Sequence, residues 1–238
     1  MRTQWLLPGW LVALAALPAA ASTFNIAPIR AELGGGHRTE ALTLTNVEDE
    51  PVVVDVRVVA WSQRNGQEQL DETRELLVTP PVLQIPAKGE QIIRVALRRE
   101  ADPAQELTYR VIFDEVPQAA PVAFNGLRVA LRLSVPVFVA PSRGRAAPNV
   151  AWDAHALADG GLEIAATNRG TGHLQISDFD MQWPGVKDGL HGMTSKYVLP
   201  GSRITWTLKA RESIHGPLVI HGHSDQGEFA ADVVEIGL

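Results

Sequence analysis

Apolar and polar residues alternate along most of the chain, and this pattern predicts a protein made almost entirely of β-strands. Strands are expected over 41–46, 52–61, 83–86, 91–97 and 107–113, and again over 149–152, 162–168, 173–181, 195–199, 203–208, 217–223 and 229–236. Asn65-Gly66 is typical of a two-residue hairpin turn. A short helical turn over 101–106 stays open as an alternative. Short strands at near-regular spacing favour a β-sandwich.

The longest alternating segment runs from Gly126 to Pro141. Its odd positions are all apolar: Leu127, Val129, Leu131, Leu133, Val135, Val137 and Val139. Successive side chains of a strand point to opposite faces, so one face would be an aliphatic ridge roughly 40 Å long. Such a strand is either a half-buried part of a core or an edge that pairs with another chain, and its unusual length favours the second interpretation.

The first 21 residues have the pattern of a signal peptide. Arg2 precedes an apolar run over 6–17, and Ala19–Ala21 supplies small residues for cleavage. This run is short for a membrane span, although an uncleaved anchor is the alternative, and no later segment predicts stable membrane insertion. The polar stretch 141–145 predicts a linker. We therefore expect a signal peptide over 1–21, an N-terminal domain over 22–141 and a C-terminal β-sandwich domain over 142–238.

Composition narrows the possible functions. Apolar residues make up 45% of the 238 residues, enough for two domains with cores, and the net charge of −6 argues against a nucleic-acid partner. The chain has no cysteine, which excludes thiol catalysis and thiolate metal ligands. No Gly-x-Ser-x-Gly sequence or phosphate-binding loop is present, so we expect neither an enzyme nor a cofactor.

Two rival functions belong to other classes. A secreted carbohydrate- or matrix-binding module of two sandwich domains would use exposed aromatic residues such as Trp183. A small metalloprotein would use His215, His221 and His223, since imidazole pairs on one strand face can bind zinc or copper. Spacing alone is weak evidence for metal, and the expected metal content is none.

An ordered set of segments carries a family resemblance. Ile26–Arg30, Leu42–Asn46, Val54–Gln63, Pro80-Pro81, Ile85–Val95 and Tyr109–Pro117 follow one another in that order. In order and spacing they resemble the N-terminal domain of periplasmic pilus chaperones, the PapD-like family of the chaperone–usher pathway. The resemblance covers residues 24–141, and it is weaker over 150–238.

The resemblance implies two immunoglobulin-like β-sandwich domains joined at an angle, with a cleft between them, in a periplasmic, non-enzymatic chaperone. Such a chaperone binds a pilus or fimbrial subunit by donating a β-strand and delivers it to an outer-membrane usher. The matching donor residues are Leu127, Val129 and Leu131, with Leu133 as their neighbour. The free protein is expected to self-associate where its apolar ridge is exposed.

The resemblance also implies charged sites. Arg30 matches the first of two basic residues that bind the subunit's C-terminal carboxylate, but Pro136 stands where the family has a lysine. Lys88, Arg128 and Arg132 are the alternatives for the second basic residue. An ion network between the domains is matched by Arg94, Glu106 and Asp225.

Overall fold

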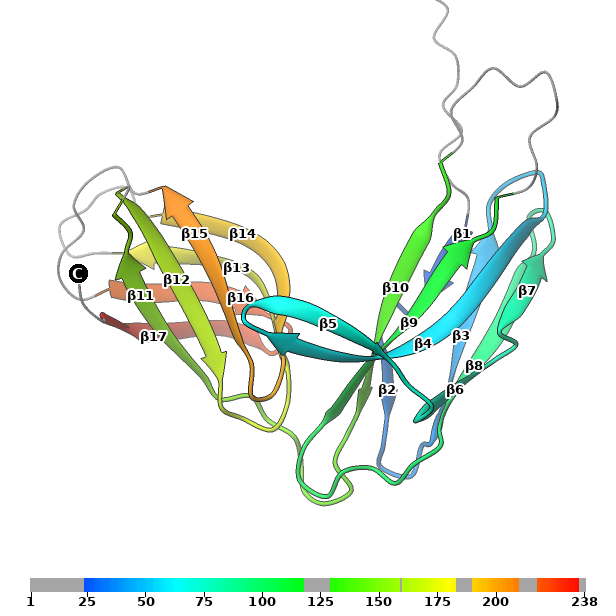
Figure 1. Ribbon diagram of the computed structural model, residues 1–238, viewed down its shortest axis with the longest axis horizontal. Helices are drawn as coiled ribbons and strands as arrows, with labels where there is room; N and C mark the ends of the chain where they lie inside the picture. Colours follow the sequence, from blue (N-terminus) through cyan, green and yellow to red (C-terminus); the bar gives the residue numbers. More distant parts are fainter. Residues whose placement is uncertain (1–23, 118–128, 159, 183–189, 210–217, 236–238) are drawn as a thin grey trace, which may run out of the picture.

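The structure is a computed structural model that describes residues 24–117, 129–158, 160–182, 190–209 and 218–235. These residues form seventeen strands and no helix, in two β domains set at an angle to each other (Figure 1). The expected boundary at 141/142 falls between β10 and β11. Residues 101–106 contain a bend at 103–105 and no helical turn, and the Asp102 carboxylate there accepts hydrogen bonds from the N–H groups of Ala104 and Gln105.

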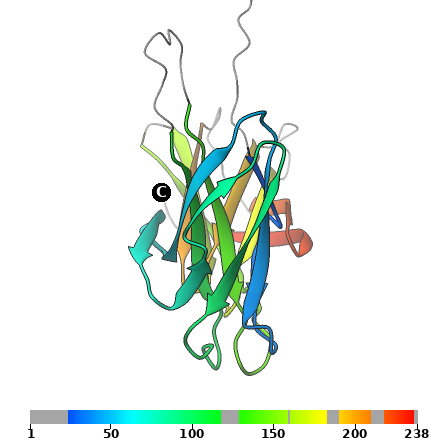
Figure 2. The same cartoon turned by 90° about the vertical axis from the view of Figure 1, so that its right-hand side faces the viewer.

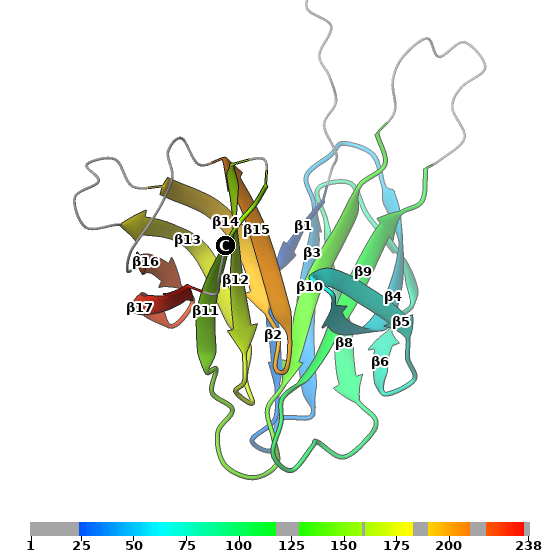
Figure 3. The same cartoon turned by 60° about the vertical axis from the view of Figure 1, so that its left-hand side comes forward.

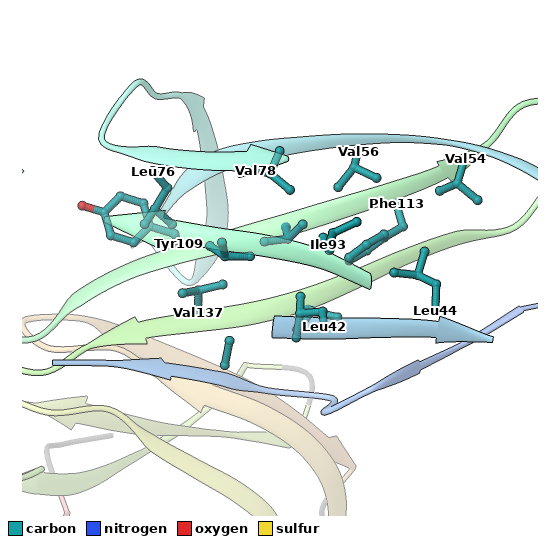
Figure 4. Close-up of a cluster of buried hydrophobic side chains, with 14 of the residues drawn as sticks. Leu42, Leu44, Val54, Val56, Leu76, Val78, Ile93, Tyr109, Phe113 and Val137 are labelled. Carbon is teal, nitrogen blue, oxygen red and sulfur yellow. The ribbon is translucent and has the colours of Figure 1, made fainter. Parts of the chain in front are cut away.

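Two sheets make up the N-terminal domain. The first has the order β1 (Phe24–Ala27), β3 (Thr39–Asn46), β8 (Glu90–Leu97) and β6 (Leu76–Thr79). The second has the order β2 (Ala31–Leu33), β10 (Arg132–Val139), β9 (Leu107–Glu115), β4 (Val52–Arg64) and β5 (Gln67–Glu72), and β7 (Val82–Ile85) also pairs with β4. The two sheets enclose an apolar core, to which both contribute fully buried residues such as Leu42, Ile93 and Phe113 (Figure 4).

The β4–β5 hairpin extends away from this core. Its turn has Asn65 at φ 52° and Gly66 at φ 74°, the two positive values that the predicted Asn-Gly turn requires, and Arg64 pairs with Gln67 across it. Figure 2 shows this hairpin standing out to one side of the N-terminal domain. Its tip lies against the C-terminal domain, because a Cβ atom built at Gly66 would be 3.7 Å from Oγ1 of Thr205.

The C-terminal domain is one seven-stranded sheet that folds around its own core. Its order is β14 (Leu190–Val198), β13 (Leu174–Gln182), β16 (Leu218–Ser224), β17 (Gly227–Glu235), β11 (Val150–Ala156), β12 (Gly161–Asn168) and β15 (Arg203–Lys209). The two end strands meet where Trp206 Nε1 donates a hydrogen bond to Thr194 Oγ1 over 3.2 Å. Inside, Trp152 packs on Phe179 and Trp206, so these two tryptophans belong to the core.

A third, smaller cluster joins the domains. Trp61 and Phe138 of the N-terminal domain are buried against Leu199 and the ring of Tyr197 from the C-terminal domain. Figure 3 shows β2 and β10 on the side of the N-terminal domain that faces the C-terminal domain. The side-chain amide of Gln63 adds two hydrogen bonds across the joint. Its Nε2 donates to the carbonyl of Tyr197 (2.7 Å), and its Oε1 accepts from the N–H of Leu199 (3.0 Å).

Candidate functional site: the free edge of β10 and the residues beside it

The apolar ridge of the long segment is buried at one end and exposed at the other. Val135, Val137 and Val139 are buried in the core of the N-terminal domain. Leu131 and Leu133 are partly buried against that core, whereas Val129 is 61% exposed. The expected single ridge facing outward is therefore wrong for its C-terminal half, which is ordinary core. Leu127 lies outside the described residues.

Strand β10 has a free edge along most of its length. Along one side it pairs with β9 from Arg132 to Val139. Along the other side β2 pairs with it, in parallel, only at Val137 to Val139. Within the described part of the chain, no strand pairs with this side of β10 from Arg132 to Pro136. An unpaired strand edge offers its N–H and C=O groups to another chain.

The backbone register shows which groups the free edge offers. The N–H of Glu115 donates to the carbonyl of Leu131, so odd-numbered residues of β10 direct their backbone groups toward β9. Arg132, Ser134 and Pro136 consequently direct theirs away from β9. Pro136 has no N–H, and at this position its absence costs no hydrogen bond to β9, which explains how a proline fits inside this strand.

Arg30 stands where the free edge ends. Ala31 of β2 is buried and pairs with Val137. Arg30, the residue before it, is therefore level with Pro136. Its side chain is 33% exposed; Nη1 lies 2.8 Å from Oδ2 of Asp225 and Nε lies 3.2 Å from Oε1 of Glu32. Burial opposes the charged form of Arg30, but these two carboxylates outweigh it and raise the pKa of the guanidinium.

The two described alternatives for a second basic residue do not lie next to Arg30. Lys88 lies between β7 and β8, where its Nζ is 2.7 Å from the carbonyl of Val47 and 3.2 Å from the carboxylate of Asp49. Arg132 is on β10, but its 68% exposed side chain pairs with Asp114 on the neighbouring strand. Arg128 lies outside the described residues.

Another arginine, which the sequence did not single out, is directly beside Pro136. Arg110 of β9 is the cross-strand partner of Pro136, and its side chain is only 13% exposed. Its Nη1 donates to Oγ of Ser134 over 3.2 Å, its Nη2 lies 2.8 Å from Oε1 of Glu68, and its guanidinium carbon is 3.8 Å from the centre of the Trp61 ring. Only the register of β9 against β10 reveals this position, so no local sequence pattern could have found it.

The structure brings together two of the three residues expected in the interdomain network. Glu106 and Asp225 approach the same imidazole, that of His173, with Nδ1 2.7 Å from Glu106 and Nε2 3.3 Å from Asp225. Arg94 is not with them: it lies on β8 between buried Ile93 and Val95, with its own side chain exposed on the outer face of the other sheet. The basic residues of this network are His173 and Arg30, and the expected role of Arg94 is corrected accordingly.

The ring of His173 is almost completely buried between the two domains. Its side chain is 11% exposed, and the ring stacks on Phe138 with centroids 3.5 Å apart. Burial lowers the pKa of the imidazole, but hydrogen bonds to Asp225 and Glu106 outweigh it, so the pKa is raised. The pKa of Asp225 is lowered because the hydrogen bonds from His173 and the backbone outweigh the effect of burial.

The histidines of β16 do not form a metal site with their described neighbours. His223 lies 2.8 Å from Asp178 and 3.8 Å from Glu228, and His221 is exposed beside them. Among the residues that the structure describes, no three acidic, histidine or cysteine side chains are placed as metal ligands. His215 and Trp183 fall outside the described residues. The described residues also contain no helix that is long and apolar enough to span a membrane.

Comparison with known proteins gives the family. The profile described as "Pili and flagellar-assembly chaperone, PapD N-terminal domain" matches residues 23–144. The chain belongs to this chaperone family. The match spans the whole N-terminal domain, including the free edge of β10, and confirms the resemblance found in the sequence. No curated protein sequence matches the chain.

Solved structures of other pilus chaperones have the same two-domain fold. A CsuC–CsuE chaperone–tip adhesion subunit pre-assembly complex of Acinetobacter baumannii matches with a TM-score of 0.69 at 21% identity, covering 91% of this chain and 100% of that one. The YadV chaperone matches with a TM-score of 0.63 at 19% identity, covering 88% and 98%. The Salmonella enterica SafA pilin–SafB chaperone complex gives 0.61 at 17% identity, covering 90% and 98%. The expected all-β fold of two immunoglobulin-like domains is confirmed.

Proposed function

We propose that this chaperone captures an incomplete pilus or fimbrial subunit at the free edge of β10, in the periplasm, and delivers it to an outer-membrane usher. The carrying observation is that one edge of β10 has no partner strand from Arg132 to Pro136 among the described residues, and that the chain leads back from there to exposed Val129. Main-chain hydrogen bonds along such an edge accept many sequences, while alternate side chains fill pockets in the partner. The role requires no catalytic residue.

The donor residues are those at the exposed end of the ridge. Val129 contributes apolar surface because it is 61% exposed, and Leu131 and Leu133 continue the same face toward the core. Burial of one such side chain is worth about 1.5–3 kcal/mol. Leu127 continues the alternation by its sequence position. A free edge with an apolar face also favours self-association of the unoccupied chaperone.

The charges beside the free edge favour one orientation of the bound strand. A strand that runs parallel to β10, as β2 does, would end with its C-terminus at Pro136, beside Arg30. An antiparallel strand would place its N-terminal ammonium there, against a like charge. Arg30 can hold a carboxylate through two parallel hydrogen bonds, so the parallel orientation is favoured and the subunit's C-terminus is the end that it binds.

Capture of a client by wild-type and variant protein tests this function. The tagged protein is purified from the periplasm of its source cells, and bound proteins are identified by mass spectrometry. Wild type is expected to retain a small, strand-rich secreted protein, and Val129→Glu is expected to lose it, because a carboxylate cannot enter an apolar subunit pocket without a large desolvation cost.

The matched control is Val82→Glu, which places the same charge on a side chain that is 56% exposed on β7, away from β10. Val82→Glu should capture the client like wild type. Equal capture by the Val129→Glu and wild-type proteins, with both folded by circular dichroism, would count against strand donation. Retention of a glycan or matrix component in its place would favour the binding-module alternative.

A further inference from the structure

One part of the joint between the domains holds together without any group that titrates near neutral pH. Gln63 forms two hydrogen bonds with the backbone at Tyr197 and Leu199, and the buried Trp61 ring packs against the same segment. The hairpin tip adds a contact at Gly66. Burial raises the pKa of the Tyr197 phenol, so this group stays neutral. These contacts, which we call the hairpin contact, are therefore the same in mild acid and in mild alkali.

The other part of the joint is a line of charged groups that crosses between the domains twice. Glu106 of the N-terminal domain lies 2.7 Å from Nδ1 of His173 in the C-terminal domain and accepts the backbone N–H of the same histidine over 3.2 Å. Nε2 of His173 lies 3.3 Å from Oδ2 of Asp225. That oxygen lies 2.8 Å from Nη1 of Arg30, which is back in the N-terminal domain and also pairs with Glu32. We call Glu106, His173, Asp225 and Arg30 the charged line.

His173 is the member of the charged line whose charge changes near neutral pH. Burial raises the pKa of Asp225, but hydrogen bonds from His173 and the backbone outweigh it and lower the pKa, so this carboxylate stays ionised. Protonated His173 donates a hydrogen bond to a carboxylate at each ring nitrogen. The neutral ring directs a lone pair at one of them and leaves Arg30 as the remaining cation of the line. The aromatic rings beside it, of Phe138 and Tyr197, supply no compensating charge.

We propose that His173 is a proton-controlled switch that sets the angle between the two domains. Its protonated form completes the charged line, and its neutral form breaks the line while the hairpin contact persists. Because one of two contacts is lost, the domains stay joined but turn about the contact that remains. The free edge of β10 lies on the side that faces the C-terminal domain, so the space beside this edge changes with pH (Figure 3). Such a switch acts whether or not a client is bound.

The residues of the charged line are placed where the fold can absorb a rotation. Each lies one residue outside a strand: Arg30 precedes β2, Glu106 precedes β9, His173 precedes β13 and Asp225 follows β16. Strand ends and turns take up the changes of backbone angle when domains move against each other. The N–H of Glu106 donates to the carbonyl of Thr171 over 3.0 Å, which limits how far these segments separate. The expected movement is therefore a small rotation that changes neither core.

The distance between two spin labels tests the switch directly. The chain has no cysteine, so Gln84→Cys and Thr207→Cys place one label at an exposed position of each domain, on β7 and β15. Double electron–electron resonance on this labelled parent should give one narrow distance distribution at pH 5.5, and at pH 8.5 the distribution should shift and broaden. Burial lowers the pKa of His173, but hydrogen bonds to Asp225 and Glu106 outweigh it and raise the pKa, so the midpoint should lie above about pH 6.5.

Two substitutions of His173 should hold the joint in opposite states. His173→Gln carries no charge, so its distribution at pH 5.5 should match that of the parent at pH 8.5. His173→Arg keeps a planar cation that can stack on Phe138 and donate to both carboxylates, so its distribution should keep the low-pH form at both pH values. Glu106→Gln removes one of the carboxylates that stabilise the imidazolium, so the midpoint should fall by about one pH unit.

His223→Gln is the matched control. A hydrogen bond to Asp178 raises the pKa of His223 as well, but this histidine lies on β16 outside the joint. His223→Gln should respond to pH like the parent.

An unchanged distance distribution of the parent between pH 5.5 and 8.5 overturns the inference, as does a pH response that persists in His173→Gln. Loss of the response in His223→Gln overturns it too, since the titrating group would then lie elsewhere. If His173→Gln does not fold, His173→Arg and Glu106→Gln decide: a constant low-pH distribution and a lowered midpoint support the switch, and a pH response in the first or an unchanged midpoint in the second contradicts it.

Discussion

A single histidine provides the central cation of the domain joint. His173 stacks on Phe138 and has a carboxylate at each ring nitrogen, Glu106 at Nδ1 and Asp225 at Nε2. Each nitrogen can donate to its carboxylate only when both carry a proton, so this geometry selects the imidazolium form. Unlike arginine, histidine loses that charge near neutral pH.

The stability of the joint should therefore depend on pH. The pKa of His173 is raised in the folded protein, so its contribution is complete below the unfolded pKa of about 6.5 and is lost as pH rises through the higher folded value. The lowered pKa of Asp225 has the opposite sign, and its contribution is lost as pH falls below about 3.9. Thermal unfolding should give a smaller difference between wild type and His173→Gln at pH 8.5 than at pH 5.5.

His155, which is near Asp153 on the exposed side of β11, provides the control. His155→Gln removes an imidazole outside the joint and controls for the loss of a histidine as such. A constant difference between wild type and His173→Gln from pH 5.5 to 8.5 would contradict the assignment of the imidazolium.

Strand β10 is part of the core at its C-terminal end and offers a free edge at its N-terminal end. Near Val139 it is central core, paired on both sides, and from Pro136 back to Arg132 it has one free side. The same alternation of side chains continues through both parts. Substitutions on the apolar face near Val139 should therefore lower the stability of the fold, whereas those toward Val129 should weaken client binding.

This gradient predicts a difference between Val137→Ala and Val129→Ala. Val137 is fully buried, so loss of two methyl groups at about 0.8 kcal/mol each, plus a cavity term, should cost about 2 kcal/mol of unfolding free energy or more. Val129→Ala should change it by less than about 0.5 kcal/mol and weaken client capture instead. Urea unfolding and client pull-down of both variants check this, and similar unfolding losses would contradict the assigned burial.

The sequence predicted the positions of the strands better than it predicted which of their side chains are buried in the core and which are exposed. Alternation marks Val129 and Val137 identically, and only the packing of the two sheets decides that Val137 is buried in the core while Val129 is exposed. The Asn65-Gly66 turn was predictable because its backbone requirement is local. Arg110 and His173 were missed because their partners Glu68, Pro136, Glu106 and Asp225 come from distant parts of the chain. Arg94 was misplaced because it matched a family pattern without a contact to fix it.

At the scale of the whole molecule, the two domains are joined by several independent contacts. Gln63 pairs with the backbone of β14 and the residue after it, Trp61 and Phe138 form an aromatic cluster with Tyr197, and Arg30 pairs with Asp225. The β4–β5 hairpin, which includes Gln63, also reaches the C-terminal domain at its tip (Figure 1). The relative orientation of the domains therefore depends on uncharged contacts as well as on the ion pairs.

Gln63→Ala should weaken the coupling between the domains. It removes two hydrogen bonds of about 0.5–1.5 kcal/mol each, so about 1–3 kcal/mol of coupling is lost. Calorimetric unfolding should broaden or separate into two transitions. Gln67→Ala, an exposed glutamine on the same hairpin, should unfold like wild type. One unchanged transition in Gln63→Ala would show that the other contacts between the domains couple them without Gln63.

The parallel strand β2 has a consequence for the clients that the protein can hold. It closes the edge of β10 at Val137, so the free edge of β10 from Arg132 to Pro136 and the three residues back to Val129 together span about eight residues, roughly 26 Å. In the proposed complex, the end of the free edge that β2 closes is also the end where Arg30 lies. The C-terminus of every client strand is therefore held at the same position. A longer final strand overhangs beyond Val129, and a shorter one leaves that valine uncovered. The register of the bound strand is therefore fixed at its C-terminal end, and final strands of different length bind to β10 in the same alignment.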